Sequence, residues 1–326
     1  FRAASSCMSM NSAKPGRRIR FPKLKFQKPE HTLRQILKSP TARADFLRSI
    51  GFLAPSVLGV LVFFIVPFCV VVYYSVIESP VNHNFVFLDN FIRVIQNTSF
   101  RIAVKNTAAF SAVAVPLAVI LSLGLALILE CKIPLKSQFR TFFLSPMMVP
   151  IASVVLIWQV LFHYNGSLNS LLAMFGADKI DWLKSQYCLV VITILFLWKN
   201  LGYNMILFMA ALNNIPRELL EVAEVEGASK LHQFLHIKLR YLSPTVLFVT
   251  ILSLINSFKV FREIYLLTGN YPYEGLYMLQ HFMNNTFASL DYQKLSAAAV
   301  LMALVMVVII ALLFVIEDRF GKDVEG

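Results

Sequence analysis

The stretch LSAAAVLMALVMVVIIALLFVI, from Leu295 to Ile316, is 22 residues long and carries no charged side chain. A helix rises ~1.5 Å per residue, so this stretch can cross the roughly 30 Å hydrocarbon core of a bilayer. Five similar stretches precede it: Gly51 to Ile77, Thr107 to Leu129, Thr141 to Phe162, Tyr187 to Leu212 and Pro244 to Leu267. The sequence therefore predicts an all-α, polytopic membrane protein with six transmembrane helices.

The composition supports the same class of protein. Of the 326 residues, 57% are hydrophobic and 15% are charged, whereas soluble domains are about half apolar and a quarter charged. A net charge of +12 would suggest nucleic-acid binding in a soluble protein. Here the basic residues gather in particular loops, so we expect a lipid bilayer as the partner and no nucleic acid.

The distribution of Lys and Arg predicts the orientation. The N-terminal segment, the second and fourth loops and the C-terminal tail together hold 21 of them, whereas the other three loops hold six. The richer side is expected to be cytoplasmic, which places both termini inside. We interpret residues 1–47 as a basic cytoplasmic extension that lies against anionic lipid, and residues 48–326 as the transmembrane domain.

The loop of residues 213–243, between the fourth and fifth spans, has the pattern of a short amphipathic helix. Pro216 suits a first helical turn, Glu218 and Glu221 favour the positive end of the helix dipole, and Gly227 favours a stop. Such an apolar stripe predicts docking onto a partner protein or onto the chain's own surface. The alternative is a connecting helix that merely lies on the bilayer.

This loop resembles the EAA loop of ABC importer permeases, in which Glu-Ala-Ala is followed by Gly and then by Ile-x-Leu-Pro. The matching positions are Glu221, Ala223, Gly227, Ile237 and Leu239. Glu226 replaces the usual Asp, Val222 replaces an Ala, and Arg240 replaces the Pro. In that family the loop fits a cleft on the ATPase subunit. The resemblance implies that coupling role for Glu221, Ala223, Glu226, Gly227 and Ala228.

The resemblance extends along the chain from about residue 48 and is to the carbohydrate-uptake, maltose-importer-like permeases with a type I core. It rests on Leu53-Ala54-Pro55, Phe87 to Phe91, Phe139-Arg140-Thr141, Pro146, Trp158, Phe258 to Phe261 and Ile264 to Gly269. It implies a multi-pass subunit of the bacterial plasma (inner) membrane. The implied partners are a second homologous permease, two ATPase subunits, an extracytoplasmic substrate-binding protein and a carbohydrate. ATP and Mg would be bound by the ATPase partners, with no cofactor in this chain.

Charged side chains are expensive inside a membrane and usually face a cavity or a partner. Lys259 and Glu263 are four residues apart in the fifth span, so we expect them to pair. Gly202 is expected to interrupt the fourth helix, since irregular backbone in a membrane normally lines a cavity. The alternative is that these polar residues hold helices together or reach an interface.

The resemblance places a mid-membrane sugar path near Met147, Ile151, Trp198, Lys199, Asn200, Gly202, Tyr203, Asn256, Lys259 and Arg262. Relatives often carry Asp where this chain has Arg262. With Lys199 and Lys259, this gives three cations and one nearby acid, Glu263. Cations at low dielectric bind a carboxylate strongly. We therefore hypothesise an acidic oligosaccharide, a uronate oligomer such as alginate, as the substrate. The alternatives are a neutral sugar or a non-sugar solute.

Several other classes of protein lack support in the sequence. No P-loop is present, so this chain is expected to be a transport subunit and not an enzyme. The four cysteines are scattered and are interpreted as packing residues, and no metal site is expected. A secondary transporter would show related halves, and an intramembrane enzyme would need a nucleophile–base or metal constellation in facing spans. Neither pattern is evident.

Overall fold

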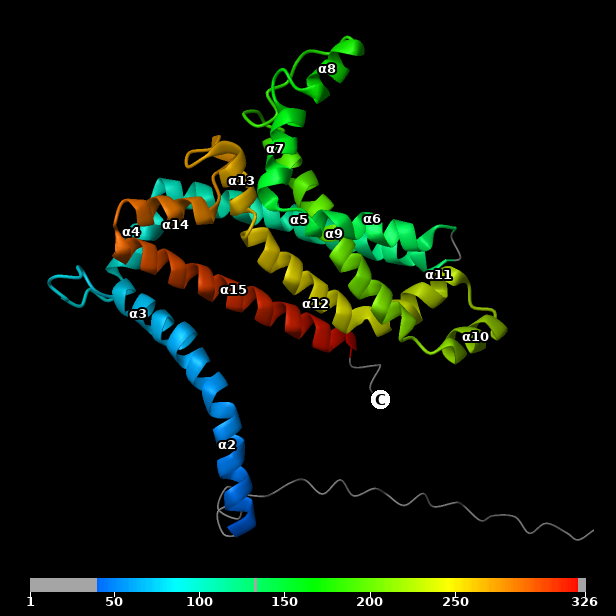
Figure 1. Cartoon of the computed structure of the whole chain (residues 1–326), viewed down its shortest axis with the longest axis horizontal. Helices are drawn as coiled ribbons and strands as arrows, with labels where there is room; N and C mark the ends of the chain where they lie inside the picture. Colours follow the sequence, from blue (N-terminus) through cyan, green and yellow to red (C-terminus); the bar gives the residue numbers. More distant parts are fainter. Residues whose placement is uncertain (1–39, 132–133, 322–326) are drawn as a thin grey trace, which may run out of the picture. The chain divides into compact units, whose positions relative to one another are not determined.

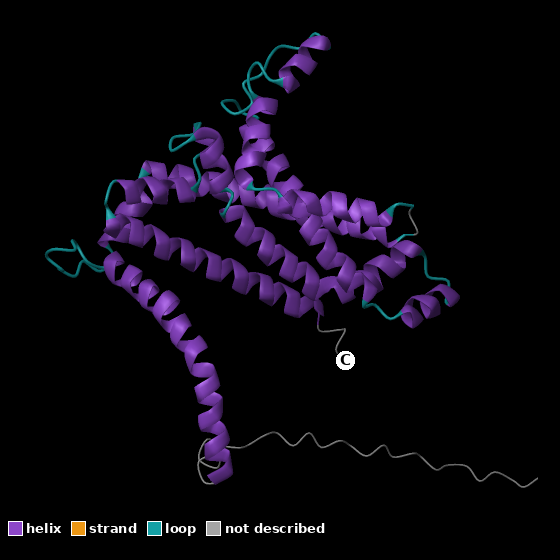
Figure 2. Ribbon diagram, viewed as in Figure 1, coloured by secondary structure: helices purple, strands orange, loops and turns teal. Residues whose placement is uncertain are grey.

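The computed structural model describes residues 40–131 and 134–321, which is where every structural statement below applies. Regular structure there is helical, apart from one isolated bridge between Ile77 and Phe85 (Figure 2). The all-α prediction is confirmed. The chain divides into two compact units between Phe64 and Ile65. Most of the expected basic extension, residues 1–39, lies outside the described residues.

The first unit contains helix α2 (Pro40–Val60) and most of the π-helical turn η1 (Leu61–Ile65), which continues into the second unit. Large apolar side chains from Phe52 onward are exposed to the surroundings along this stretch. The π turn ends two residues before Pro67, whose missing N–H leaves one carbonyl of that turn without its ordinary helical donor. Local chain chemistry thus accounts for the irregular turn.

The second unit holds the remaining elements, which Figure 1 labels along the chain. They are α3 (Val66–Ser75), α4 (Asp89–Gln96), α5 (Thr98–Glu130), α6 (Lys136–Met148), α7 (Ile151–Phe162), α8 (Ser167–Met174), α9 (Cys188–Asn213), α10 (Arg217–Val225), α11 (Lys230–Gln233), η2 (Phe234–Lys238), α12 (Leu239–Phe258), α13 (Phe261–Thr268), η3 (Glu274–Leu276), α14 (Leu279–Ala288) and α15 (Tyr292–Gly321).

Helix α5 is the centre of the packing, and it lies against α9 and α12 (Figure 1). Its fully buried positions are small: Ala103, Ala114, Ala118 and Ala126 have no exposed surface. Small side chains let helix backbones approach closely, which is the main source of helix association in a membrane. The larger Phe110 of α5 packs edge to face against the ring of Phe196 in α9.

Six helical stretches are long and apolar enough to cross a membrane, as the sequence predicts. They are Arg48–Ser75, Thr98–Glu130, Ile151–Met174, Cys188–Asn213, Lys230–Thr268 and Tyr292–Arg319. The third differs from its predicted bounds, because Thr141 to Phe162 is divided between α6 and α7. Pro150 causes the break: it has no N–H to donate, and it holds Val149 in an extended conformation with ψ 130°.

Gly202 does not interrupt the fourth span, so that prediction is wrong. Helix α9 runs unbroken from Cys188 to Asn213, and Gly202 is buried within it. A Cβ atom at this position would lie 1.8 Å from the backbone oxygen of Phe143 in α6. The glycine is therefore needed for the close approach of two helices and not for a bend.

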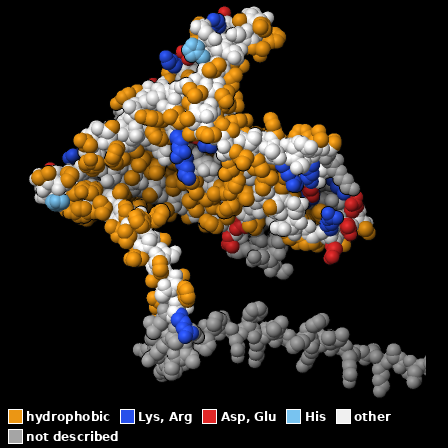
Figure 3. Space-filling view, in the orientation of Figure 1, with side chains coloured by type: hydrophobic (Ala, Val, Ile, Leu, Met, Phe, Trp, Pro, Cys, Tyr) orange, Lys and Arg blue, Asp and Glu red, His pale blue; other side chains and the backbone are white. Residues whose placement is uncertain are grey.

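The outer surface matches a bilayer environment. In Figure 3 hydrophobic side chains cover much of the visible face, while charged side chains gather over the region of α10 and α11. Among the most exposed apolar residues of α15 are Leu304, Val307 and Leu312. An exposed apolar surface of this extent marks contact with lipid or with other membrane helices.

Candidate functional site: the coupling loop and the mid-membrane polar cluster

Helix α10 ends in a tight, fully hydrogen-bonded turn. Gly227 has a φ of +84°, in the left-handed region that favours glycine. The Ala228 N–H donates to the Ala223 carbonyl at 2.9 Å, and the Gly227 N–H donates to the Glu224 carbonyl at 3.1 Å. This pair of bonds is a Schellman motif, which satisfies two carbonyls at the helix end. Three of the five predicted coupling residues thus build the turn.

The second arm of the loop is locked to the first. The Ser229 side chain caps α11 by accepting from the His232 N–H at 3.2 Å. The buried Gln233 donates to the Ala228 carbonyl at 3.1 Å, and Lys230 pairs with Glu224 at 3.1 Å. Sequence reasoning missed Ser229 and Gln233. A Ser directly after the helix-ending Gly-Ala could have indicated the cap.

Helix α10 presents an apolar ridge away from the protein. The exposed fractions of Leu219, Val222 and Val225 are 40%, 57% and 89%. Leu220, on the opposite face, packs against the core that α5, α9 and α12 share. Among the described residues, one face of α10 is therefore packed against this chain, while the other face is exposed. The predicted coupling residues Glu221 and Glu226 are also exposed, on either side of the ridge's end.

An ion pair anchors the base of the loop. The ammonium of Lys238, at the end of η2, lies 2.7 and 2.8 Å from the two carboxylate oxygens of Glu130, at the end of α5. The two residues are 108 positions apart, so no local pattern could have paired them. The contact connects the loop of residues 213–243 directly to α5, the central helix of the bundle.

Within the membrane-spanning region, Glu263 pairs with Lys199 and not with Lys259. The Lys199 ammonium lies 2.5 Å from one Glu263 oxygen, and the second oxygen is buried without a hydrogen-bond partner. The predicted pairing fails because α12 ends at Phe258 and α13 begins at Phe261. That break removes the four-residue helical spacing on which the prediction depended.

Amide and hydroxyl side chains connect neighbouring helices. Asn256 donates to Asn200 at 3.0 Å, and Asn204 donates to Ser253 at 2.9 Å, in both cases between α12 and α9. A third bond, 2.8 Å long, joins two buried serines of α5 and α12. Asn200 and Asn256 thus have the contacts expected of helix-packing residues. Asn204 is one of the polar residues that the sequence places in the fourth span, whereas Ser253 was not singled out from the sequence.

The other predicted path residues lie at interruptions of the spans or on one stretch of α9. Met147 and Ile151 flank the break between α6 and α7, while Lys259 lies in the break between α12 and α13 and Arg262 lies in the first turn of α13. Lys259 and Arg262 are exposed, and the ion pairs of the described residues do not include them. Trp198 and Tyr203 of α9 are 39% and 37% exposed.

Metal binding finds no support in the described part of the chain. Within residues 40–131 and 134–321, no group of three His, Cys, Asp or Glu side chains could hold an ion. His232 and His236 stack with ring centroids 4.0 Å apart, but two exposed imidazoles without a third ligand make a weak site.

Comparison with known proteins agrees with this geometry. A family model described as "Binding-protein-dependent transport system inner membrane component" matches residues 131–326. The trehalose/maltose transport system permease protein MalF of Thermococcus litoralis is 30% identical over 90% of this chain and 100% of its own length. The sulfoquinovosyl glycerol transport system permease protein SmoG of Agrobacterium fabrum is 29% identical over 84% of this chain and 92% of its own length.

Solved structures show the same fold. A bacterial alginate ABC transporter, crystallised with an alginate pentasaccharide-bound periplasmic protein, contains a chain that superimposes with a TM-score of 0.75 at 22% identity. The match covers 86% of this chain and 97% of that chain. The chain therefore belongs to the binding-protein-dependent inner membrane component family: it is a multi-pass, non-catalytic permease subunit of an ABC sugar importer, whose ATP is bound by separate ATPase subunits.

Proposed function

We propose that this permease imports an acidic oligosaccharide, forms its translocation path with a second, related permease, and is driven by two ATPase subunits through the coupling loop, residues 213–243. The basic segments, both termini and the coupling loop lie in the cytoplasm in this proposal, because 21 of the basic residues fall on that side. A substrate-binding protein delivers the sugar from the other side.

The coupling role rests on two features of α10. Its apolar ridge of Leu219, Val222 and Val225 is exposed, which is unfavourable in water and is relieved by a partner's cleft. The Schellman turn closes the end of α10, and the Lys238–Glu130 ion pair holds the end of the loop to α5. A rigidly held loop transmits a movement of the ATPase subunits to the spans, whereas a flexible loop would not.

The charge balance around the broken fifth span carries the choice of substrate. Glu263 neutralises Lys199, so this pair contributes little net charge. Lys259, in the break, and Arg262, just after it, are exposed, and the described residues offer them no carboxylate partner. Guanidinium and ammonium groups at reduced dielectric bind carboxylates by charge-assisted hydrogen bonds. The remaining positive charge favours a uronate over a neutral sugar.

The comparisons are consistent with an acidic substrate, but they do not establish it. The structural neighbour belongs to a transporter of alginate, an acidic polysaccharide, and SmoG is named for an anionic sugar derivative. The Thermococcus relative is named for trehalose and maltose, which are neutral. The same permease fold thus accommodates both kinds of sugar, and the side chains of the path must decide.

The test measures substrate-stimulated ATPase activity of the complete importer in proteoliposomes, with acidic and neutral oligosaccharides of equal length. We expect stimulation by the acidic series. Because a hydrogen bond to a charged group contributes about 1.5–3 kcal/mol, Arg262→Gln should raise the half-saturating concentration roughly 10-fold or more. Lys105→Gln, which removes an exposed cation of α5 outside this region, is the matched control and should leave it unchanged.

The outcomes separate the parts of the proposal. Equal stimulation by neutral and acidic sugars, unaffected by Arg262→Gln, would overturn the acidic substrate and keep the importer. Failure of every sugar in a complex with active ATPases would point to a non-sugar solute.

A further inference from the structure

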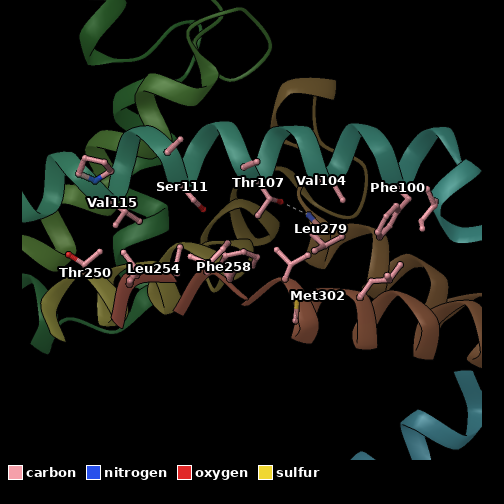
Figure 4. Close-up of a pocket in the computed structure, with 18 residues that line it drawn as sticks. Phe100, Val104, Thr107, Ser111, Val115, Thr250, Leu254, Phe258, Leu279 and Met302 are labelled. Atoms are coloured by element: carbon pink, nitrogen blue, oxygen red, sulfur yellow. Dashed lines mark hydrogen bonds between the residues drawn. The ribbon is translucent and has the colours of Figure 1, made fainter. Parts of the chain in front are cut away.

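A long apolar groove runs along the outside of the second unit. The part of it next to α14 is a cavity of about 550 Å³ between α5, α12, α14 and α15. Figure 4 shows its walls: Val104 and Val115 of α5, Leu254 and Phe258 of α12, and Met302 of α15. The Thr107 hydroxyl in the lining already accepts a 2.9 Å bond from the Leu279 N–H. Apolar groups thus form nearly the whole surface of the groove.

The groove continues towards the coupling-loop end of the bundle. A second cavity, of about 480 Å³, lies between α12 and α15. Thr250 and Leu313 line both cavities, so the two spaces are neighbours. The second cavity changes character along its length, because it ends at Arg240 and Arg319. An apolar channel and a basic mouth therefore lie next to each other along α12 and α15.

The mouth contains two cations and one carboxylate. Glu317 lines the same cavity as the two arginines and accepts a 3.4 Å hydrogen bond from Ser243. Arg240 takes part in an interaction within the protein, but a guanidinium has five N–H donors and can bind an additional anion. Arg319 is exposed. The two guanidinium groups fit a phosphate, and Glu317 can attract an amine beside it.

We propose that this groove binds a glycerophospholipid, with the headgroup phosphate between Arg240 and Arg319 and an acyl chain along α15 towards Ile309. The dimensions agree. The ten helical rises from Ile309 to Arg319 span about 15 Å, which is half of the roughly 30 Å hydrocarbon core. A lipid of the leaflet at the coupling-loop end has its phosphate and its chain at these two depths.

Other occupants match fewer of these features. A transmembrane helix is about 10–12 Å in diameter with its side chains, so it could cover the groove but not enter it. A free phosphate would use the arginines and leave the apolar channel empty. Only a molecule with a narrow apolar chain and an anionic head uses both parts of the site. The inference does not depend on which sugar is transported.

The test uses the assembled importer in nanodiscs that contain a phospholipid with a photoreactive acyl chain. We expect labelling to concentrate on residues 235–254 and 301–319. Ile309→Trp fills the groove and should reduce this labelling about tenfold, whereas Val308→Trp, on a 56% exposed neighbour outside the lining, should not. Arg319→Gln should weaken retention of the lipid roughly tenfold, and Lys136→Gln should not.

Headgroup variants then test the phosphate. Phosphatidylglycerol and phosphatidylethanolamine should both be retained after detergent exchange, as measured by native mass spectrometry. Equal retention of a diacylglycerol with the same chains would overturn recognition through the arginines. Uniform labelling of all helices would overturn the site, as would a cysteine at Ile309 that cross-links to the partner permease while no lipid is retained.

Discussion

Replacement of Gly227 by Ala isolates the geometry of the coupling loop from its contacts. Gly227 has a φ of +84°, and a Cβ atom there would meet nothing within 4 Å. The substitution therefore adds no clash, and its effect is the conformational strain of an alanine in the left-handed region, about 1–2 kcal/mol. That free energy corresponds to a roughly 5–30-fold shift of the turn's equilibrium away from the Schellman conformation.

The assay measures two properties of the importer: the affinity of the permease for the ATPase subunits, and substrate-stimulated ATPase activity. If the partner docks on α10 in the conformation described here, Gly227→Ala should weaken assembly by a similar 5–30-fold factor. Gly227→Asn should be milder, since asparagine tolerates the left-handed region better than alanine.

Gly176→Ala is the matched control. Gly176 has a φ of +75°, and a Cβ atom would again meet nothing within 4 Å, but it lies in the loop between α8 and α9, outside residues 213–243. The Gly176→Ala variant should lose a similar amount of stability, but it should still bind the ATPase subunits. Equal effects of the two alanine variants on assembly, or full coupling with Gly227→Ala, would refute the reasoning.

Three further predictions concern the interior. Gly202→Ala should lower the thermal unfolding midpoint in detergent markedly, because its Cβ overlaps the backbone of α6, whereas Gly124→Ala, with open space around it, should leave the midpoint unchanged or raise it. Glu263→Gln should destabilise the protein by about 2 kcal/mol in chemical unfolding, and adding Lys199→Leu should recover part of this, because the unpaired cation is then removed. Burial lowers the pKa of His281, in α14 outside the candidate spans, from an ordinary value of 6.5 to about 4. The folded protein therefore favours the neutral imidazole, and this stability is present above pH 6.5 and is lost as the pH falls towards 4. His281→Asn should flatten that part of the stability–pH curve, by roughly 3 kcal/mol at most, and an unchanged curve would contradict the assignment.

The sequence by itself determined the class of the protein and the local form of the coupling loop. Six apolar stretches of spanning length need no tertiary information, because each helix satisfies its own backbone hydrogen bonds in lipid. The helix stop at Gly227 follows from the residue itself, since the left-handed conformation strains any residue with a Cβ atom. Nearest-neighbour chemistry was enough for these features.

Only the tertiary structure decided the partners of the polar groups. Glu263 pairs with Lys199, 64 positions away, because the break after Phe258 removes the helical spacing that would bring Lys259 next to Glu263. Gly202 proved to be a contact point for α6, which no pattern within α9 could reveal. The lipid groove likewise joins residues of α5, α12 and α15. Such contacts depend on how close helix backbones approach one another, and that distance is a property of the packed bundle and not of any single segment.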